Sequence, residues 1–188
     1  MKKIFVLVGE SGSGKDTIAR EVLNSNLSRV VTTTTRQIRY NESEGIDYYF
    51  ITEDEFKLKI ENDEFIEFNK FKTWYYGLTK QSLLSNSHDN LLIILNPKGL
   101  YSLIDYGAHN NIQVVPIYIY CNERLRLIRT LQRNDNVDEV LRRVNTDRVD
   151  FENIISIVAN NNGYLVKNEN SLEDAISDVK GIILDYID

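Results

Sequence analysis

A glycine-rich stretch near the N-terminus carries the clearest chemical signal of the sequence. It reads GESGSGKDT over residues 9–17, after the apolar run Ile4–Val8 and before a helical pattern over Asp16–Asn24. The spacing Gly-x-x-x-x-Gly-Lys between a strand and a helix is typical of a phosphate-binding loop. Its glycines let backbone N–H groups face an anion, the helix N-terminus adds positive potential, and the lysine reaches the β- and γ-phosphates. The predicted ATP-binding residues of this loop are Ser11, Gly12, Ser13, Gly14, Lys15, Asp16 and Thr17.

The residue after Lys15 departs from the usual pattern. A hydroxyl that reaches Mg²⁺ normally stands there, whereas this chain has Asp16 and places Thr17 one position later. Mg²⁺ prefers hard oxygen ligands and keeps several waters, so the carboxylate of Asp16 could hold it directly or through water. Thr17 is turned about 100° around the helix from that position. Both residues are candidates for the metal, and the sequence does not choose between them.

A second group of polar residues could bind another nucleotide. Arg36 and Arg39 lie in a threonine-rich loop and can form a cationic fork for a phosphate, to which Tyr48 and Tyr76 could donate hydroxyl bonds. Glu67 lies in an otherwise apolar segment, where its carboxylate could accept the two adjacent N–H donors that guanine presents and adenine lacks. On composition alone, the arginines could equally be solvated loop charges and the tyrosines core aromatics.

The order of these segments resembles the guanylate kinase family. The family's acceptor loop reads Ser/Thr-x-Thr-Thr-Arg-x-x-Arg, as in Thr32–Arg39, and the match continues through Glu42, Gly45–Phe50, Glu64–Glu67 and Tyr75–Gly77. The resemblance implies ATP-dependent phosphorylation of GMP or dGMP to GDP or dGDP, with Mg²⁺ accompanying the ATP. It also implies the family's fold: a P-loop nucleoside monophosphate kinase with a mostly parallel sheet, a small α+β insert that binds the acceptor, and a helical lid.

The same resemblance assigns roles to individual residues. Thr32 and Glu67 would read guanine, and arginines of the lid would close over the transferred phosphoryl group. The residue Asn168, in the stretch VKNEN, would lie near the adenine of ATP. The implied catalytic residues are Lys15, Arg36, Arg129, Arg133 and Arg143; the implied GMP-binding residues are Thr32, Arg36, Arg39, Tyr48, Glu67, Tyr76, Thr79 and Asn96. The alternative for the lid arginines is an exposed amphipathic face.

Two departures from the family pattern bear on guanine selectivity and metal handling. Where the family usually has a hydroxyl just after Tyr-Gly, this chain has Leu78, followed by Thr79. Where the family carries an acidic pair near its third strand, this chain reads ILNPKG, with Ile94 and Asn96 in place of both acids. An asparagine can accept a hydrogen bond there but brings no charge.

The elements that must position these residues alternate between strands and helices. Three short apolar runs are typical of strands buried on both faces, which indicates a parallel sheet: Ile4–Val8, Leu91–Leu95 and Val114–Tyr120. Helical patterns cover Asp16–Asn24, Gly99–Asn110, Asn122–Arg133, Val137–Ala159 and Ser171–Tyr186. In the middle, antiparallel strands are expected at Tyr48–Ile51, Glu64–Phe71 and Thr73–Tyr76, with a helix at Glu53–Ile60. We expect one domain over residues 1–188, with an acceptor-binding lobe near 32–82, a lid near 129–147, and a core formed by the stretches near 1–31 and 83–188.

Composition narrows the possible partners. A formal net charge of −6 over 188 residues gives no support to a general nucleic-acid or membrane surface. Cys121 is the only cysteine, which excludes an intrachain disulfide and suits a reducing cytoplasm. The expected partners are therefore small nucleotides, ATP and GMP or dGMP, bound by a cytoplasmic monomer or homodimer.

Three alternative functions stay open at this point. A ribosyl bisphosphate kinase also uses a Gly-Lys-Asp-Ser/Thr loop, although it lacks the Arg-x-x-Arg and Asp-Tyr-x-Phe elements kept here. A kinase with a broader range of (deoxy)nucleoside monophosphates would suit Leu78 and Asn96. A non-catalytic guanylate-kinase-like binding module is the third, but such modules typically lose the phosphate loop, which is intact here at Gly14-Lys15.

Overall fold

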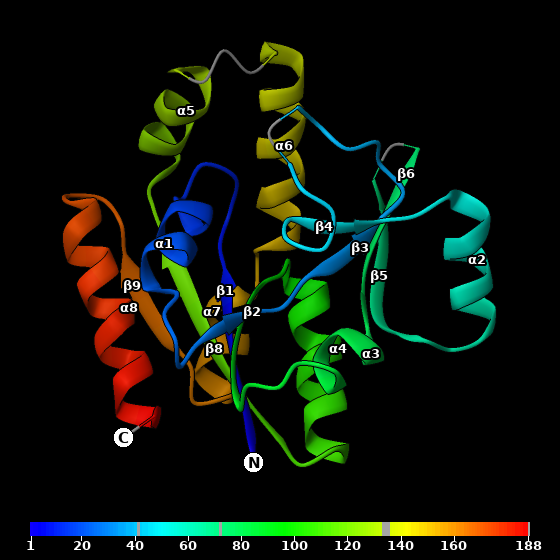
Figure 1. Ribbon diagram of the computed structural model, residues 1–188. Helices are drawn as coiled ribbons and strands as arrows, with labels where there is room; N and C mark the ends of the chain where they lie inside the picture. Colours follow the sequence, from blue (N-terminus) through cyan, green and yellow to red (C-terminus); the bar gives the residue numbers. More distant parts are fainter. Residues whose placement is uncertain (41, 72, 133–135, 188) are drawn as a thin grey trace.

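The computed structural model, which describes residues 1–40, 42–71, 73–132 and 136–187, is built on a parallel five-stranded sheet (Figure 1). The strand order is β2-β7-β1-β8-β9, and every neighbouring pair is parallel. The strands are β1 Lys2–Val8, β2 Ser28–Arg29, β7 Asn90–Ile94, β8 Ile112–Tyr120 and β9 Tyr164–Lys167. The predicted α/β fold is confirmed. The three strands expected from apolar runs are β1, β7 and β8.

Helices cover both faces of this sheet, and alternate side chains of β1 enter two separate buried clusters. One cluster includes Ile4 and Val6 together with side chains of α4 and α7, and the other includes Phe5 and Leu7 together with side chains of α1 and α8. The bounds of these helices are α1 Lys15–Val22, α4 Pro97–His109, α7 Ile154–Asn160 and α8 Leu172–Ile187. Because both faces are buried, the strand reads as one continuous apolar run.

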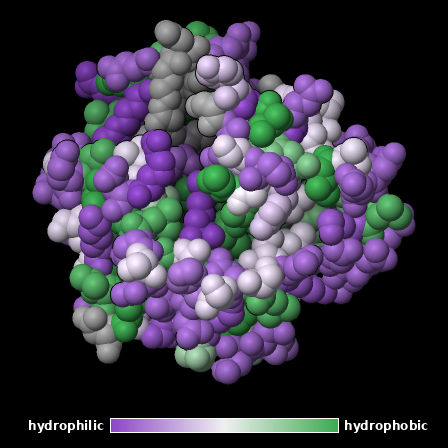
Figure 2. Space-filling model, in the orientation of Figure 1, coloured by the Kyte–Doolittle hydropathy of each residue, from purple (hydrophilic) through white to green (hydrophobic). Residues whose placement is uncertain are grey.

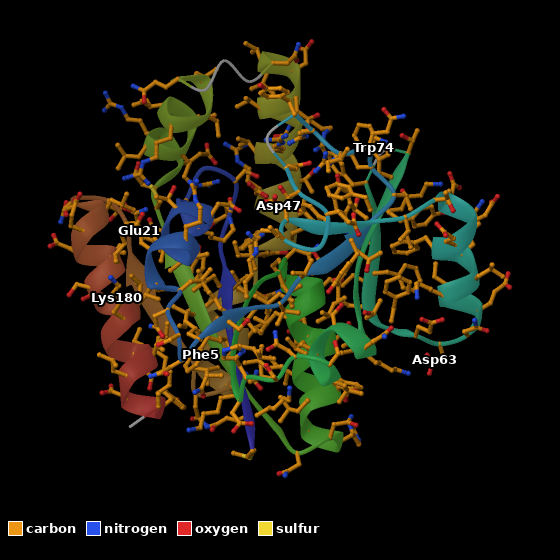
Figure 3. All side chains as sticks on the ribbon, viewed as in Figure 1. Phe5, Glu21, Asp47, Asp63, Trp74 and Lys180 are labelled. Atoms are coloured by element: carbon orange, nitrogen blue, oxygen red, sulfur yellow. The ribbon has the colours of Figure 1, made fainter. Side chains whose placement is uncertain are left out.

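A second sheet is formed by the middle of the chain, in the order β4-β3-β6-β5. Its elements are β3 Thr32–Thr34, β4 Tyr48–Phe50, α2 Glu53–Glu61, β5 Phe65–Phe71, β6 Trp74–Thr79 and α3 Lys80–Leu84. Figure 3 shows Trp74 at one end of this region and Asp63, between α2 and β5, at the other. The expectation that the strand at Tyr48 is antiparallel was wrong, since β4 pairs with β3 in parallel. After β3 the chain returns to the end of the sheet where β3 began, so β4 runs in the same direction as β3. β3 and β5 are antiparallel to β6.

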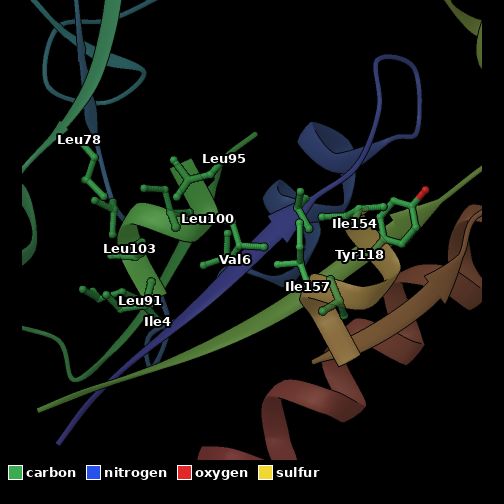
Figure 4. Packing of buried hydrophobic residues seen from close by; sticks show 14 of the residues in the cluster. Ile4, Val6, Leu78, Leu91, Leu95, Leu100, Leu103, Tyr118, Ile154 and Ile157 are labelled. Carbon is green, nitrogen blue, oxygen red and sulfur yellow. The ribbon is translucent and has the colours of Figure 1, made fainter. Parts of the chain in front are cut away.

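The second sheet is anchored in the main core through β6. The side chain of Leu78 is fully buried and belongs to the same hydrophobic cluster as Leu100 and Leu103 of α4. Figure 4 shows these three side chains on neighbouring elements of that cluster. The leucine that stands after Tyr-Gly is therefore a core residue.

Two further helices, α5 (Glu123–Gln132) and α6 (Val137–Asp150), stand above the carboxyl end of the sheet, with the loop after β1 between them (Figure 1). The single helix expected over Val137–Ala159 was wrong, since the chain turns at residues 151–153 before α7 begins. The turn lets Phe151 pack against the core and against Tyr118, whose ring centre is 6.3 Å away. It also lets Ile154 and Ile157 enter the core from a new direction.

The surface is mostly hydrophilic on the face shown in Figure 2, with hydrophobic residues dispersed among hydrophilic ones. In the described part of the chain, none of the helices combines the length and the apolar character needed to cross a membrane.

Candidate functional site

The loop after β1 has the backbone shape of a phosphate cradle. Gly12 and Gly14 have φ angles of +82° and +96°, in the left-handed region that glycine adopts without strain. A Cβ atom on Gly12 would lie 2.7 Å from the carbonyl oxygen of Arg126, and one on Gly14 would overlap Nδ2 of Asn168. Because Arg126 and Asn168 pack closely against the loop at these two positions, tertiary packing as well as the local sequence determines its conformation.

Lys15 begins α1 and turns its side chain back over this loop. Its Nζ donates to the carbonyl oxygens of Gly9 at 2.5 Å and Glu10 at 3.0 Å. Burial lowers the pKa of Lys15 below its ordinary value, while the carboxylates of Asp16 and Asp147 oppose that shift. The ammonium group is thus held at the mouth of the cradle, where it can exchange carbonyl partners for phosphate oxygens.

A cleft of about 420 Å³ joins the phosphate loop to the second sheet. This volume is in the range of small-ligand sites. Predicted site residues that line it are Ser11, Lys15, Thr32, Tyr48, Glu67, Tyr76, Asn96 and Arg143. The structure therefore brings residues from the predicted donor and acceptor groups to one cavity, at the carboxyl end of the parallel sheet where α/β folds place their ligands.

Glu67 lines the cleft where β5 meets the start of α4. Burial raises the pKa of its carboxyl to about 7, although the charge of Lys98 and a backbone hydrogen bond from Leu78 act in the opposite direction. A Cβ on Gly99 would lie only 3.2 Å from Oε2 of Glu67, so the carboxylate packs directly on the first turn of α4. A carboxylate held this firmly can accept two parallel N–H bonds with little further ordering.

The loop that carries Arg36 and Arg39 is organised by Glu42. Arg36 pairs with Oε1 of Glu42 at 2.7 Å, and the backbone N–H of Arg39 donates to Oε2 at 3.0 Å. The guanidinium of Arg36 also lies over the ring of Tyr48, at 5.6 Å from its centre. The two arginines line a neighbouring hollow with Trp74 rather than the main cleft, while Tyr48 and Tyr76 face the cleft itself.

The comparison with known proteins decides the family. The guanylate kinase family model matches residues 1–186. The chain belongs to the guanylate kinase family. The guanylate kinase of Mycoplasma genitalium is 31% identical over 189 residues, which cover 97% of this chain and 75% of that protein. The guanylate kinase of Chlorobium chlorochromatii is 32% identical over 195 residues, covering 98% and 96% of the two chains.

A solved structure supports the fold independently. A crystal structure of guanylate kinase from Anaplasma phagocytophilum matches 98% of this chain and 86% of that chain, with a TM-score of 0.66 and 24% sequence identity. The predicted family and the predicted P-loop nucleoside monophosphate kinase fold are both confirmed.

The arginines expected in the lid of a guanylate kinase are placed differently from one another. Arg143 lines the cleft, and its Nε donates to Glu139 at 3.0 Å. Arg129 points toward the end of β8, where its NH2 donates to the carbonyl of Asn168 at 3.1 Å and its NH1 lies 3.4 Å from the sulfur of Cys121. Arg133 lies outside the described residues.

Two other predicted residues have structural partners away from the cleft. Thr79 is buried and caps α3 through its hydroxyl, which accepts the N–H of Ser82 at 3.1 Å; it lines a separate pocket on the opposite side of the sheet. Asn168 is 1% exposed, and its Nδ2 donates to the carbonyl of Ser13 at 2.8 Å. Thr79 is thus not brought to the cleft, and Asn168 braces the phosphate loop from behind.

Asn96 combines a cap with a place in the cleft. Its Oδ1 accepts the N–H of Gly99 at 2.8 Å and so caps α4, while Pro97 occupies the first turn. Ile94, at the end of β7, also lines the cleft. The two positions where the family usually carries acids are therefore at the site, and both are uncharged here.

Three residues at the phosphate loop were missed by the sequence analysis. Arg126 of α5 contacts both Glu10 of the loop and Asp147 of α6, and Asp147 also lines the cleft. The available signal was the position of Arg126 three residues before Arg129, which places it on a neighbouring part of the same helix face. Its partners lie far away in the sequence, so spacing alone could not identify them.

Proposed function

We propose that this guanylate kinase family member transfers the γ-phosphoryl group of ATP to GMP or dGMP, giving ADP and GDP or dGDP. The observation that carries the proposal is one cleft lined by the phosphate-loop lysine, Lys15, and by a half-buried carboxylate, Glu67, in a chain that matches the family throughout. An oxygen of the acceptor phosphate attacks the γ-phosphorus, and the bond from that phosphorus to the β–γ bridging oxygen breaks. The bond electrons leave with ADP.

The donor half of the reaction is assigned to the loop and the helices above it. Backbone N–H groups of the loop and the ammonium of Lys15 would hold the β- and γ-phosphates and stabilise the negative charge on the three equatorial oxygens of the transferred phosphoryl group. Arg143 would approach the same oxygens from α6. Arg129 would join them only if α5 moved toward the cleft, and Arg133 keeps its predicted role at the transferred phosphoryl group. Asn168 would support the loop, with adenine as its predicted neighbour.

The acceptor half is assigned to the second sheet. Tyr48 and Tyr76 would donate to the acceptor phosphate, and Arg36 and Arg39 would reach it from their neighbouring hollow. Glu67 would accept the N1 and N2 hydrogens of guanine, and Asn96 and Thr32 would complete the polar floor. A water-excluding closure of the two halves would protect ATP from hydrolysis.

The residues near Lys15 fit a magnesium ion carried by ATP. Asp16 is exposed in the first turn of α1, with Thr17 beside it. Among the described residues, no group of three or more His, Cys, Asp or Glu side chains forms a metal cage, which accords with an ion held mainly by phosphates and water. Asp16 and Thr17 would hold the ion, and Mg²⁺ would neutralise charge on the β- and γ-phosphates. The proposed location is the cytoplasm, and the proposed assembly is a monomer or homodimer.

A coupled ADP-release assay tests the proposed function. ATP with Mg²⁺ is offered with a panel of nucleoside and deoxynucleoside monophosphates, and we expect turnover with GMP and dGMP above all others. Equal turnover with several bases would favour the broader kinase. No turnover with any acceptor, while ATP still binds, would favour a binding module.

The raised pKa of Glu67 predicts a pH-dependent affinity for GMP. Guanine N–H groups bind the ionised carboxylate, so proton loss from Glu67 must precede or accompany binding. Since its pKa is about 7, we expect the KM for GMP to fall by roughly tenfold as the pH rises from 6 to 8. The second ionisation of the GMP phosphate, near pH 6, contributes to the same profile. Glu67→Gln separates the two, because only the phosphate contribution remains in that variant; identical profiles for both proteins would contradict the assignment.

A further inference from the structure

The phosphate loop is held to α5 and α6 by a small network of charged side chains. The backbone N–H of Ser11 donates to Oδ2 of Asp147 at 2.8 Å. Arg126 lies 3.6 Å from the same Oδ2 and 3.7 Å from Oε1 of Glu10. Its Nε donates to the carbonyl of Cys121 at 3.0 Å. Loop, α5 and α6 therefore meet at one guanidinium group, at the place where Figure 1 shows the loop rising between the two helices.

The network is largely buried, so each of its charged groups needs a partner. The side chains of Arg126, Glu10 and Asp147 are 7%, 12% and 13% exposed. Buried ions persist when they are paired and hydrogen-bonded. Two carboxylates share one guanidinium, and Asp147 makes its shortest contact with the amide of Ser11 instead. A carboxylate oxygen and a phosphate oxygen can each accept a hydrogen bond from that amide N–H.

The amide of Ser11 belongs to the donor site of the proposed kinase. Asp147 lines the same cleft as Ser11 and Lys15, and its charge acts on the ammonium of Lys15. A phosphate group that enters the cradle brings negative oxygens to this position. The carboxylate and the phosphate then compete for the same N–H and repel each other. Arg126, only 3.6 Å away, gives Asp147 an alternative partner.

We propose that Asp147 is a positioning residue that occupies the phosphate loop in the nucleotide-free protein and is displaced toward Arg126 by the phosphates of the donor. This inference rests on the proposed function, since Asp147 lies at the proposed ATP site. The carboxylate of Asp147 takes the place of a phosphate oxygen at the amide of Ser11 and keeps α6 against the loop. It weakens nucleotide binding, because part of the binding free energy is used to displace it. Release of ADP is assisted by its return.

The test is the affinity for ADP, measured by isothermal titration calorimetry with EDTA and again with Mg²⁺. Asp147→Asn keeps the shape but removes the charge, and we expect its dissociation constant for ADP to fall at least about threefold under both conditions. The KM for ATP should fall in parallel, and kcat should fall if ADP release limits turnover. The KM for GMP should not change. If Asp147→Asn does not fold, Asp147→Ala removes the same charge and carries the same expectation.

A second ion pair between α5 and α6 supplies the control. Arg148 pairs with Glu123 at 2.6 Å on the exposed side of the two helices and does not touch the loop. Glu123→Gln breaks a link between the same helices and should leave ADP affinity unchanged. If Glu123→Gln tightened ADP binding as much as Asp147→Asn, mere loosening of α6 would explain the effect and the proposal would be wrong.

Other outcomes also decide the matter. Unchanged or weaker ADP binding by the folded Asp147 variant overturns the proposal, and weakening only with Mg²⁺ would make Asp147 a metal ligand instead. If the unaltered chain binds neither ADP nor ATP, the proposed function fails and this inference fails with it. Normal binding and turnover with no response to Asp147→Asn would overturn this inference alone.

Discussion

Lys15→Ala is expected to lower kcat/KM for phosphoryl transfer by about 10³-fold or more, because a preorganised cation at the transferring phosphate is among the largest contributors to this chemistry. The structure indicates that this substitution removes activity without disturbing the fold. The ammonium of Lys15 bonds to carbonyl oxygens of Gly9 and Glu10 at the cleft, and water can replace those bonds when the side chain is removed. The coupled ADP-release assay at saturating GMP measures the effect.

A matched lysine on the far side of the molecule controls for this substitution. Lys180 is exposed on α8, where Figure 3 labels it. Lys180→Ala should retain full activity, and circular dichroism should show the same helix content in both variants. Turnover of Lys15→Ala within tenfold of the unaltered chain would contradict the role of Lys15.

Glu67→Gln is expected to raise the KM for GMP by about 10²-fold while leaving the KM for ATP within twofold, since a charge-assisted pair of hydrogen bonds is lost on one substrate only. The amide of the new glutamine places an N–H donor where guanine also presents N–H donors. The enzyme should therefore lose its preference for guanine as well as its affinity for GMP. Initial rates with GMP and with AMP at varied concentrations measure both effects.

The same substitution makes an independent prediction about stability. The pKa of Glu67 is raised to about 7 in the folded protein, so the neutral form is favoured by folding. Its stabilising contribution is complete below the unfolded value near 4.5 and is lost as the pH rises through about 7. Glu67→Gln should therefore gain stability relative to the unaltered chain at pH 8 and not at pH 5, as measured by urea unfolding.

A neighbouring glutamate distinguishes recognition from general damage. Glu64 lies just before the same strand, where it pairs with Lys59 at 2.7 Å outside the cleft. Glu64→Gln should change neither the KM for GMP nor the choice of base. An unaltered base preference in Glu67→Gln would show that another residue reads guanine.

Local patterns were sufficient for most of the fold and for the centre of the candidate site. The strand, glycine loop and helix around Lys15 are specified by neighbours in sequence, and both-face burial makes β1, β7 and β8 visible as apolar runs. Ser171 was expected to start the last helix, and its hydroxyl accepts the N–H of Asp174 at 3.2 Å. Such features depend on residues a few positions apart.

The errors arose where partners are distant in the chain. The break after α6 exists because Phe151 packs against Tyr118, and the parallel pairing of β4 depends on the path of a long loop. Thr79 is the exception: it was expected at the nucleotide, but its hydroxyl caps α3 by accepting the N–H of Ser82, only three residues away. The Arg126 network joins residues more than a hundred positions apart, and no periodicity reports such contacts.

The burial of Leu78 has a consequence for any attempt to redesign the acceptor. β6 contributes Tyr76 and Gly77 to the cleft and, in the very next residue, a fully buried side chain to the main core. A polar replacement at 78 would introduce a hydroxyl into a dry cluster rather than into the nucleotide site. New base preferences are therefore more accessible through the cleft-lining positions 67 and 96, which lie outside the hydrophobic clusters, provided that a replacement at 96 still caps α4. The same strand, β6, therefore serves both nucleotide recognition and core packing, but different residues of it serve each purpose.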